Sequence, residues 1–340
     1  MSEKQTRNST IDIIKLFCAV LVVFLHTVNT EVLFKDTIQE TVRRIIYRIV
    51  WCFNPVEFFF IVSAYFFFKG NNFQNAQLKK LIIRLSVLYL FWSVLYLNYL
   101  FDPFANVKTV SQFAFAGLKM VRRLLFIGVA GHMWYVLSLL YGSVILWVLM
   151  KKGHYAWAWG FAVVCYLIAL VADPYYHLFD ALPLAQKIFD LIRATFGSPY
   201  LFRGPIFIMI GSCLVKKEKC KISVAAVMFA VMAILNNLEV IMIKNNALGL
   251  QCSTTVFKPI TSYFFVLLCL NIRIDGKRSS AVVAKISTVM YFAHIFIRDL
   301  LVQSVEDMYL VWLLTMAICI CLAVVLNLIS KKFKKLNMIM

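Results

Sequence analysis

The chain has 340 residues, of which 62% are hydrophobic and 15% are charged, and its mean hydropathy is +0.81. Soluble globular proteins carry about 25% charged residues, and a soluble domain of this length has no core large enough to bury so much apolar surface. The composition therefore excludes a soluble enzyme and indicates a polytopic integral membrane protein. The net charge of +19 does not predict a nucleic-acid partner, because the cations lie in short clusters between apolar blocks.

Apolar blocks of about 20 residues, the length that crosses about 30 Å of hydrocarbon, recur along the chain. We predict an all-α fold of about ten transmembrane helices in a single membrane domain over residues 1–340. Its helical core spans about 11–330, and a short basic tail follows at 331–340. The predicted helices are residues 11–30, 49–69, 81–101, 132–150, 154–172, 201–215, 222–243, 254–272, 282–302 and 309–330.

The charges between these helices predict their orientation. An even number of helices places both termini on one side, and cytoplasmic segments of membrane proteins are enriched in lysine and arginine. With both termini cytoplasmic, every inner segment has at least two cations, whereas the outer segments 31–48, 173–200 and 303–308 are mixed or acidic. The cations of the predicted inner segments are Lys4, Arg7, Lys69, Lys79, Lys80, Arg84, Lys151, Lys152, Lys216, Lys217, Lys219, Lys221, Arg273, Lys277, Arg278, Lys285, Lys331, Lys332, Lys334 and Lys335.

The first apolar block carries Asp12 at its start and, further along, Lys15 and His26. Lys15 and His26 are 11 positions apart, which is about three helical turns, so both point to one face and lie about 16 Å apart along the axis. Charged groups at membrane depth usually line a cavity or pair with a partner. Lys15 as a snorkelling anchor and His26 as an interhelical hydrogen-bonding group are the alternatives.

Two further features precede the middle of the chain. In the block NPVEFFFIVSAYFFFKG, Pro55 interrupts the backbone ladder and Glu57 lies inside the apolar run, where a structural pair with Arg43 or Arg44 is the alternative to a functional role. Segment 111–127 is amphipathic and basic. It predicts a helix that lies in the membrane interface, with a lid over a cavity as the alternative.

Three later segments also carry polar groups. The fourth block opens with GHMWY, which places His132, Trp134 and Tyr135 at the predicted outer interface, where Trp and Tyr are enriched regardless of function. The sixth block contains Arg203. In the ninth, His294 precedes Arg298 by one turn, so the two side chains line one cavity or satisfy each other.

The nine cysteines form no CxxC pair and mostly lie in apolar blocks, so no disulfide framework, redox centre or metal site is expected. Neither a phosphate-binding glycine loop nor an HExxH motif is present, which argues against an ATPase or a membrane metalloprotease.

Several segments, in order, resemble the acyltransferase-3 family of bacterial membrane acyltransferases. TIDIIKLFCAVLVVFLH is similar to the family's opening aspartate, basic residue and histidine, and FNPVEFFFIVSAYFFFKG to its phenylalanine run. GHMWYVLSLLYG, LFRGPIFIMIGSCLV and YFAHIFI resemble its later helices. Lys15 stands where the family usually has arginine, which retains the charge but loses the planar guanidinium. Ala64 stands where glycine is usual.

The resemblance implies an O-acyltransferase of the bacterial plasma membrane. It would move an acyl group, by default acetyl, from cytoplasmic acyl-CoA to a hydroxyl of a cell-surface polysaccharide or a lipid-linked glycan. Acyl-CoA is a co-substrate, no cofactor is implied, and the partners are acyl-CoA, the glycan and membrane lipids. A transporter or flippase for a glycan or lipid-linked intermediate, without acyl transfer, is the alternative.

The same resemblance implies roles for particular residues. His26 would deprotonate the acceptor hydroxyl or relay the acyl group, since the near-neutral pKa of an imidazole suits either step. Lys15 would act beside it by holding a CoA phosphate or orienting the site. The remaining roles are donor binding by Lys80, Arg84 and Arg203, acceptor binding by Glu57, His132, Trp134 and Tyr135, and support by Asp12, Ser63, Tyr65 and His294.

Overall fold

The computed structural model describes residues 9–28, 37–70, 72–197, 199–217, 219–272, 274 and 279–340. These residues form helices and no strand. Their contacts group the chain into two compact units. Unit 1 comprises Met1–Phe59, Lys217–Ile234 and Ile260–Met340, and unit 2 comprises Phe60–Lys216 and Leu235–Pro259.

The helices follow one another along the chain with short connections. Their bounds are α1 Ser9–Thr27, α2 Thr37–Phe53, α3 Pro55–Phe68, α4 Asn75–Ser93, η1 Val94–Tyr96, α5 Leu97–Phe101, η2 Asp102–Phe104, α6 Val110–Arg122, η3 Arg123–Ile127, α7 Trp134–Lys151, α8 Tyr155–Val171, η4 Tyr176–Phe179, α9 Pro183–Phe196, α10 Tyr200–Leu214, α11 Ile222–Asn245, α12 Lys258–Asn271, α13 Ser279–Leu301, α14 Met308–Lys332 and η5 Lys334–Met338.

Each of the ten predicted segments coincides with a helix, but the helices differ in length. Seven stretches among the described residues are long and apolar enough to cross a membrane. The helices α8 and α10 are apolar but shorter, and α12 has 14 residues. At a rise of about 1.5 Å per residue, helices of this length fall short of about 30 Å of hydrocarbon. The multi-pass architecture is confirmed, and the count of ten spans stays a prediction.

The second predicted helix, residues 49–69, differs from the structure in two places, its start and a break at Asn54. It begins at Thr37 and not near residue 49, since Glu40 forms ion pairs with Arg43 and Arg44 one turn on, which stabilise the exposed turns. It is also broken in two at Asn54, which adopts a left-handed backbone conformation with φ of 46° before Pro55. Arg43 and Arg44, which the sequence offered as partners for Glu57, both form ion pairs with Glu40.

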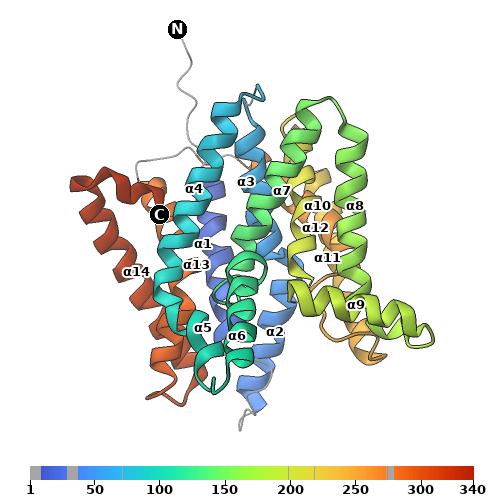
Figure 1. Ribbon diagram of the computed structural model, residues 1–340. Coiled ribbons are helices and arrows are strands. Elements are labelled where there is room, and N and C mark those ends of the chain that lie inside the picture. The colour runs from blue at the N-terminus through green and yellow to red at the C-terminus, as the bar shows by residue number, and fades with distance from the viewer. Residues whose placement is uncertain are drawn as a thin grey trace. The chain divides into compact units, whose positions relative to one another are not determined.

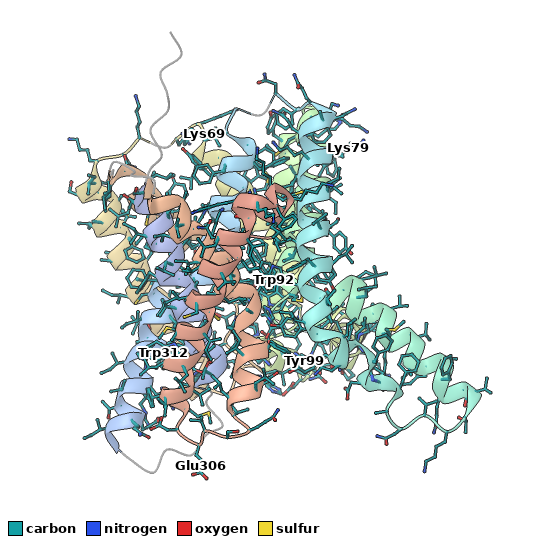
Figure 2. All side chains as sticks on the ribbon, turned by 90° about the vertical axis from the view of Figure 1, so that its left-hand side faces the viewer. Lys69, Lys79, Trp92, Tyr99, Glu306 and Trp312 are labelled. Atoms are coloured by element: carbon teal, nitrogen blue, oxygen red, sulfur yellow. The ribbon has the colours of Figure 1, made fainter. Side chains whose placement is uncertain are left out.

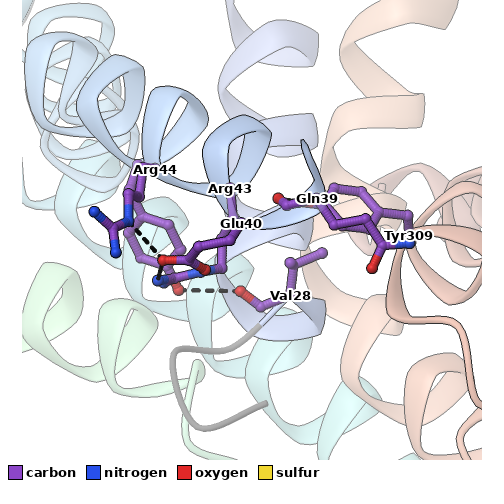
Figure 3. A network of polar contacts seen from close by, with 7 residues as sticks. Val28, Gln39, Glu40, Arg43, Arg44 and Tyr309 are labelled. Carbon is purple, nitrogen blue, oxygen red and sulfur yellow. Dashed lines mark hydrogen bonds and ion pairs between the residues drawn. The ribbon is translucent and has the colours of Figure 1, made fainter. Parts of the chain in front are cut away.

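In unit 1, α1 packs against α13 and α14. The end of α1 lies beside the start of α14, because the Phe24 ring centroid is 5.3 Å from that of Trp312. Helix α2 contacts both helices at this end (Figure 3). Its Tyr47 donates a hydrogen bond to the carbonyl of Val28, directly after α1, and Tyr309 of α14 donates one to the carbonyl of Gln39 in α2. Thus α1 and α14 run antiparallel.

In unit 2, α10 packs against both α7 and α8. It continues through Pro205, which has no N–H to donate to the carbonyl of Leu201 one turn before it. The Ser138 hydroxyl of α7 donates to that carbonyl instead, at 2.8 Å. Gly204 makes this approach possible, because a Cβ there would lie 2.2 Å from the Ser138 oxygen.

The ends of the helices agree with the predicted grouping of the inner segments. In unit 2, Lys69 and Lys79 lie at one end and Tyr99 toward the other (Figure 2), and Lys151 donates a hydrogen bond to Asn75 near the start of α4. In unit 1, Lys285 near the start of α13 donates to Asn327 near the end of α14. The side of the membrane that these ends face stays a prediction.

Two amphipathic helices lie crosswise in unit 2. Helix α6 covers most of the predicted interfacial segment and leaves Val110, Phe113 and Leu118 more than half exposed. Helix α9 falls within the predicted outer segment 173–200 and lies across the end of α8 (Figure 1). It likewise exposes Leu184 and Leu191. Exposed apolar stripes of this kind are typical of helices at a membrane surface.

Some predicted topological charges lie outside the described residues. They are Lys4, Arg7, Arg273, Lys277 and Arg278 of the inner segments and Glu31, Lys35 and Asp36 of the first outer segment.

The closest approach of α10 to α3 gives the first prediction. A Cβ at Gly211 would lie 2.4 Å from the Ile61 carbonyl oxygen and 2.7 Å from the Ala64 methyl group. We expect Gly211→Ala to lower the free energy of unfolding by about 1–3 kcal/mol, because backbone atoms must shift. Thermal unfolding of the purified protein in detergent measures this. Gly160→Ala is the control, since nothing lies within 4 Å of a Cβ there; equal stability of the two variants would contradict the prediction.

Candidate functional site

The end of α1 places His26 against a second histidine, His294 of α13. Their ring centroids are 5.2 Å apart and the ring planes are tilted by 41°. Both belong to unit 1, where α1 and α13 pack along their length. The sequence identified the two histidines separately, and the structure brings them together as a pair.

His294 has a defined tautomer. It is fully buried, and its Nδ1 lies 3.1 Å from the carbonyl oxygen of Met290 and 2.8 Å from that of Tyr291. A carbonyl oxygen only accepts hydrogen bonds, so Nδ1 carries a proton. In the neutral imidazole the lone pair is then on Nε2, and the helix backbone fixes the orientation of the ring.

Arg298 links the two helices at the same level. Its guanidinium donates a hydrogen bond of 2.7 Å to the carbonyl oxygen of His26 and also pairs with the neighbouring Asp299. The sequence placed Arg298 one turn after His294 as a cavity or pairing residue. The structure shows instead that it holds the last turn of α1, and with it the backbone of His26.

The other polar residues of unit 1 lie further along the helices. Asp12 and Glu57 are buried, and Lys15 is half-buried. Because α1 is continuous from Ser9 to Thr27, Lys15 and His26 remain about 16 Å apart along its axis. The two side chains are too far apart to act on one bond, so the predicted role of Lys15 is one of binding or orientation.

In unit 2, the start of α7 and the start of α10 form an aromatic group around a cation. Trp134 stacks on Tyr200, with ring centroids 5.1 Å apart and an interplanar angle of 28°. The guanidinium carbon of Arg203 is 5.2 Å from the Trp134 ring centroid and 5.5 Å from that of Tyr200. Arg203, predicted to bind the donor, thus lies with Trp134, which was predicted to bind the acceptor. Tyr200, three residues before Arg203, was not predicted.

A second group in unit 2 surrounds Tyr135. Its hydroxyl is 3.2 Å from the Ser63 hydroxyl, and its ring centroid is 4.5 Å from that of Phe60. Arg84 is close enough to interact electrostatically with Tyr135. The structure therefore gathers Ser63, Arg84 and Tyr135, for which the resemblance implied three different roles.

The remaining predicted residues of unit 2 lie elsewhere. His132 is buried in the turn before α7, where its ring packs edge-on against Tyr96. Tyr65 accepts a hydrogen bond from Lys69 one turn on, and Lys80 is exposed on α4. The described part of the chain contains no group of three or more His, Cys, Asp or Glu residues arranged to hold a metal ion.

Comparison with known proteins adds two findings. The chain is 23% and 25% identical, over 60% and 61% of its length, to two proteins of Enterococcus faecalis named amino-acid racemase, and covers 29% and 28% of them. It is 24% identical over 78% of its length to a serine/alanine racemase of Enterococcus gallinarum and covers 37% of that protein. The chain thus spans little more than a third of these relatives at most. No solved structure matches it significantly.

The sequence profile of the acyltransferase-3 family, described as an acyltransferase domain, matches residues 8–330. This match includes α1, which carries Lys15 and His26, and the helices of both units that hold the two groups of side chains. Because the match covers nearly the whole chain, this membrane protein belongs to the acyltransferase-3 family.

Proposed function

We propose that the protein is a multi-pass O-acyltransferase of the bacterial plasma membrane. It would transfer an acyl group, by default acetyl, from cytoplasmic acyl-CoA to a hydroxyl of a cell-surface or lipid-linked glycan. Family membership supplies the reaction class. The observation that carries the proposal is the histidine pair of unit 1, where an imidazole on α1 lies 5.2 Å from a second, buried imidazole of fixed orientation.

In this proposal His26 is the general base. Its imidazole takes the proton of the acceptor hydroxyl as that oxygen attacks the thioester carbonyl carbon of acyl-CoA. The new C–O bond forms, the C–S bond breaks, and the thiolate of CoA leaves and takes up the proton. The Arg298 hydrogen bond to the His26 carbonyl holds this residue in place. The buried His294 ring fixes its surroundings.

The other predicted residues bind or support. Aromatic faces such as Trp134 and Tyr135 stack on the apolar faces of sugars, and His132 and Glu57 would complete acceptor binding with hydrogen bonds. Lys80, Arg84 and Arg203 supply positive charge for the phosphates of the donor. Asp12 would orient Lys15, while Ser63, Tyr65 and His294 hold neighbouring groups.

Transport without acyl transfer is the second candidate. The observation in its favour is that the relatives named racemases share only a part of their length with this chain. Racemisation transfers no acyl group, so in those proteins the matching part accompanies a different reaction. On this alternative the helices carry a small polar substrate, such as an amino acid or a glycan precursor, across the membrane.

Mass spectrometry of surface glycans separates the two candidates. Cells that express the wild type should add an acetyl-sized mass to the glycan. His26→Ala should reduce the initial rate of this addition about 10²- to 10⁴-fold, because the general base is lost. His154→Ala, an exposed histidine before α8, is the matched control and should retain full activity.

Membrane levels of the three proteins must be equal for this comparison. Unmodified glycan in every strain, combined with glycan export or amino-acid uptake that rises with expression and is unaffected by His26→Ala, would reject the transferase and favour transport.

His294 has its own prediction. His294→Phe keeps an aromatic ring at the buried position but removes both nitrogens, so His26 would lose its partner. We expect kcat to fall about 10- to 100-fold with KM nearly unchanged, because displacement of a catalytic group costs up to about 10² in rate. Steady-state kinetics with purified protein and varied acyl-CoA measures both constants. A kcat equal to that of the wild type would show that His294 serves packing alone.

A further inference from the structure

Unit 2 contains a cluster of buried charges of which the proposed mechanism uses only Arg203. Asp173, Arg203, Glu239 and Lys258 are each at most 6% exposed. Arg193 of α9 extends toward the same place, with a nitrogen 3.8 Å from an oxygen of Asp173. Burial of a charge is costly unless the charge is paired, so this concentration of ionic groups requires a reason.

Asp173, which follows α8, is the centre of the cluster. It is fully buried, and one carboxylate oxygen accepts a hydrogen bond of 2.6 Å from the Ser253 hydroxyl. Burial raises the pKa of its carboxyl group, while the Ser253 hydrogen bond lowers it. The next largest lowering comes from the positive charge of Arg203, ahead of those of Arg193 and Lys258. Asp173 therefore lies within electrostatic range of Arg203 as well as of Arg193 and Lys258.

Glu239 is committed to holding the fold. Its carboxylate accepts hydrogen bonds from the Tyr175 hydroxyl and from the backbone N–H groups of Val256 and Phe257. Lys258 in turn donates to the carbonyl of Ser253. Through Glu239, these bonds join α11 to the segment after α8 and to the segment before α12.

The geometry of the backbone supports the same arrangement. Gly249 lies so close to Asp173 that a Cβ there would be 2.3 Å from the Asp173 carbonyl oxygen. The N–H of Leu250 donates to that oxygen at 3.1 Å. Asp173 is thus held at its backbone by one loop and at its carboxylate by Ser253 of the same loop, which makes it a rigid anchor for a cation.

The charges of the cluster do not cancel. Three cations, Arg193, Arg203 and Lys258, face two carboxylates, and Glu239 already accepts three hydrogen bonds. The cluster therefore has one positive charge in excess. Arg203 lies against two aromatic rings that stack on each other, whereas Arg193 lies 6.0 Å from the centroid of one, Tyr176. A planar guanidinium pairs with carboxylates and phosphates through two parallel hydrogen bonds.

The rings of Trp134 and Tyr200 place two aromatic faces beside the Arg203 guanidinium. Their stacked pair lies 5.2 and 5.5 Å from the guanidinium carbon, and Tyr200 is held by a hydrogen bond of 2.6 Å from its hydroxyl to Gln251. Aromatic rings offer a face to a sugar or a base, and the adjacent guanidinium offers a partner for an oxyanion.

We propose that Arg203, Trp134 and Tyr200 bind an oxyanion, a carboxylate or phosphate, carried by a molecule with a sugar or base face. Asp173 is the positioning residue that orients Arg203 for this contact. The inference deepens the proposed function and in part rests on it, since either substrate of the transferase can supply such a group: an anionic saccharide acceptor or the phosphates of CoA.

Binding of defined probes to the purified full-length chain tests this inference. The probes are glucuronate, its neutral counterpart glucose, and coenzyme A, titrated by isothermal calorimetry in detergent. We expect glucuronate, coenzyme A or both to bind, and glucose to bind at least about 10-fold more weakly than glucuronate if the acceptor is the source. Arg203→Gln should weaken the binding of the anionic probe at least about 10-fold.

The effect of Arg203→Gln also identifies the source. Loss of glucuronate binding alone assigns the site to the acceptor, and loss of coenzyme A binding alone assigns it to the donor. Retention of wild-type affinity for both anionic probes, or failure of both to bind the wild type, would overturn the inference.

Asp173 is tested separately. Asp173→Asn should weaken binding of the same probe several-fold. The control is Asp190→Asn, which should leave binding unchanged, since Asp190 is an exposed residue of α9 that accepts a hydrogen bond from Tyr176. If Asp173→Asn does not fold, Ser253→Ala retains the carboxylate but removes its hydrogen bond, and it should weaken binding in the same direction. Wild-type binding by the folded variant would rule out the positioning role.

A parallel measurement separates this inference from the proposed function. His26→Ala should lose acyl transfer but still bind the anionic probe, since the variant retains Arg203, Trp134 and Tyr200. Arg203-dependent binding without any acyl transfer by the wild type would refute the transferase and leave the binding site standing. Acyl transfer that is unchanged in Arg203→Gln would refute the binding site and leave the transferase standing.

Discussion

The hydroxyl of Ser138 supplies to the carbonyl of Leu201 the hydrogen bond that Pro205 cannot make. At membrane depth an unsatisfied carbonyl costs several kcal/mol, because no water is present to replace the lost partner. This bond, together with the absence of a side chain at Gly204, lets α10 continue as a helix through its proline and lie directly against α7. The contact between Trp134 of α7 and Arg203 of α10 follows from this approach. The position of Arg203 thus depends on how one backbone carbonyl is satisfied.

Unit 1 applies the same constraint to a histidine. The buried ring of His294 donates through Nδ1 to carbonyl oxygens of its own helix, so the backbone determines its tautomer. Arg298, one turn on, donates to the carbonyl at the end of α1 and so satisfies a helix terminus. One turn of α13 therefore orients one histidine and holds the backbone of the other. This explains why a His and an Arg at this spacing occur together inside an apolar helix.

The sequence was sufficient for the helical blocks and for the identity of most polar residues at membrane depth, because both depend on local composition. It indicated an interruption at Pro55, but not the left-handed conformation of Asn54 that divides the helix in two. It also did not give the early start of α2, because the pairing of Glu40 with two arginines overrides the hydropathy pattern. Nor could it pair His26 with His294 or Asp173 with Ser253, which are far apart in the chain. Such pairs are set by helix packing. In the sequence, Asp173 is only one of the charges of the predicted outer segment 173–200.

The two departures from the family pattern have different physical weight. Ala64 stands where glycine is usual, and the additional methyl group needs space. Gly211 of α10 provides that space, because a Cβ at position 211 would lie 2.7 Å from the Ala64 methyl group. A close helix contact between α3 and α10 is thereby preserved, with the glycine on α10 allowing it. Lys15 keeps a positive charge about 16 Å along α1 from His26, where a long-range electrostatic or binding role needs charge more than a planar fork. Neither departure removes a group that the His26–His294 pair or the Arg203 cluster uses, so both are compatible with an active member of the family.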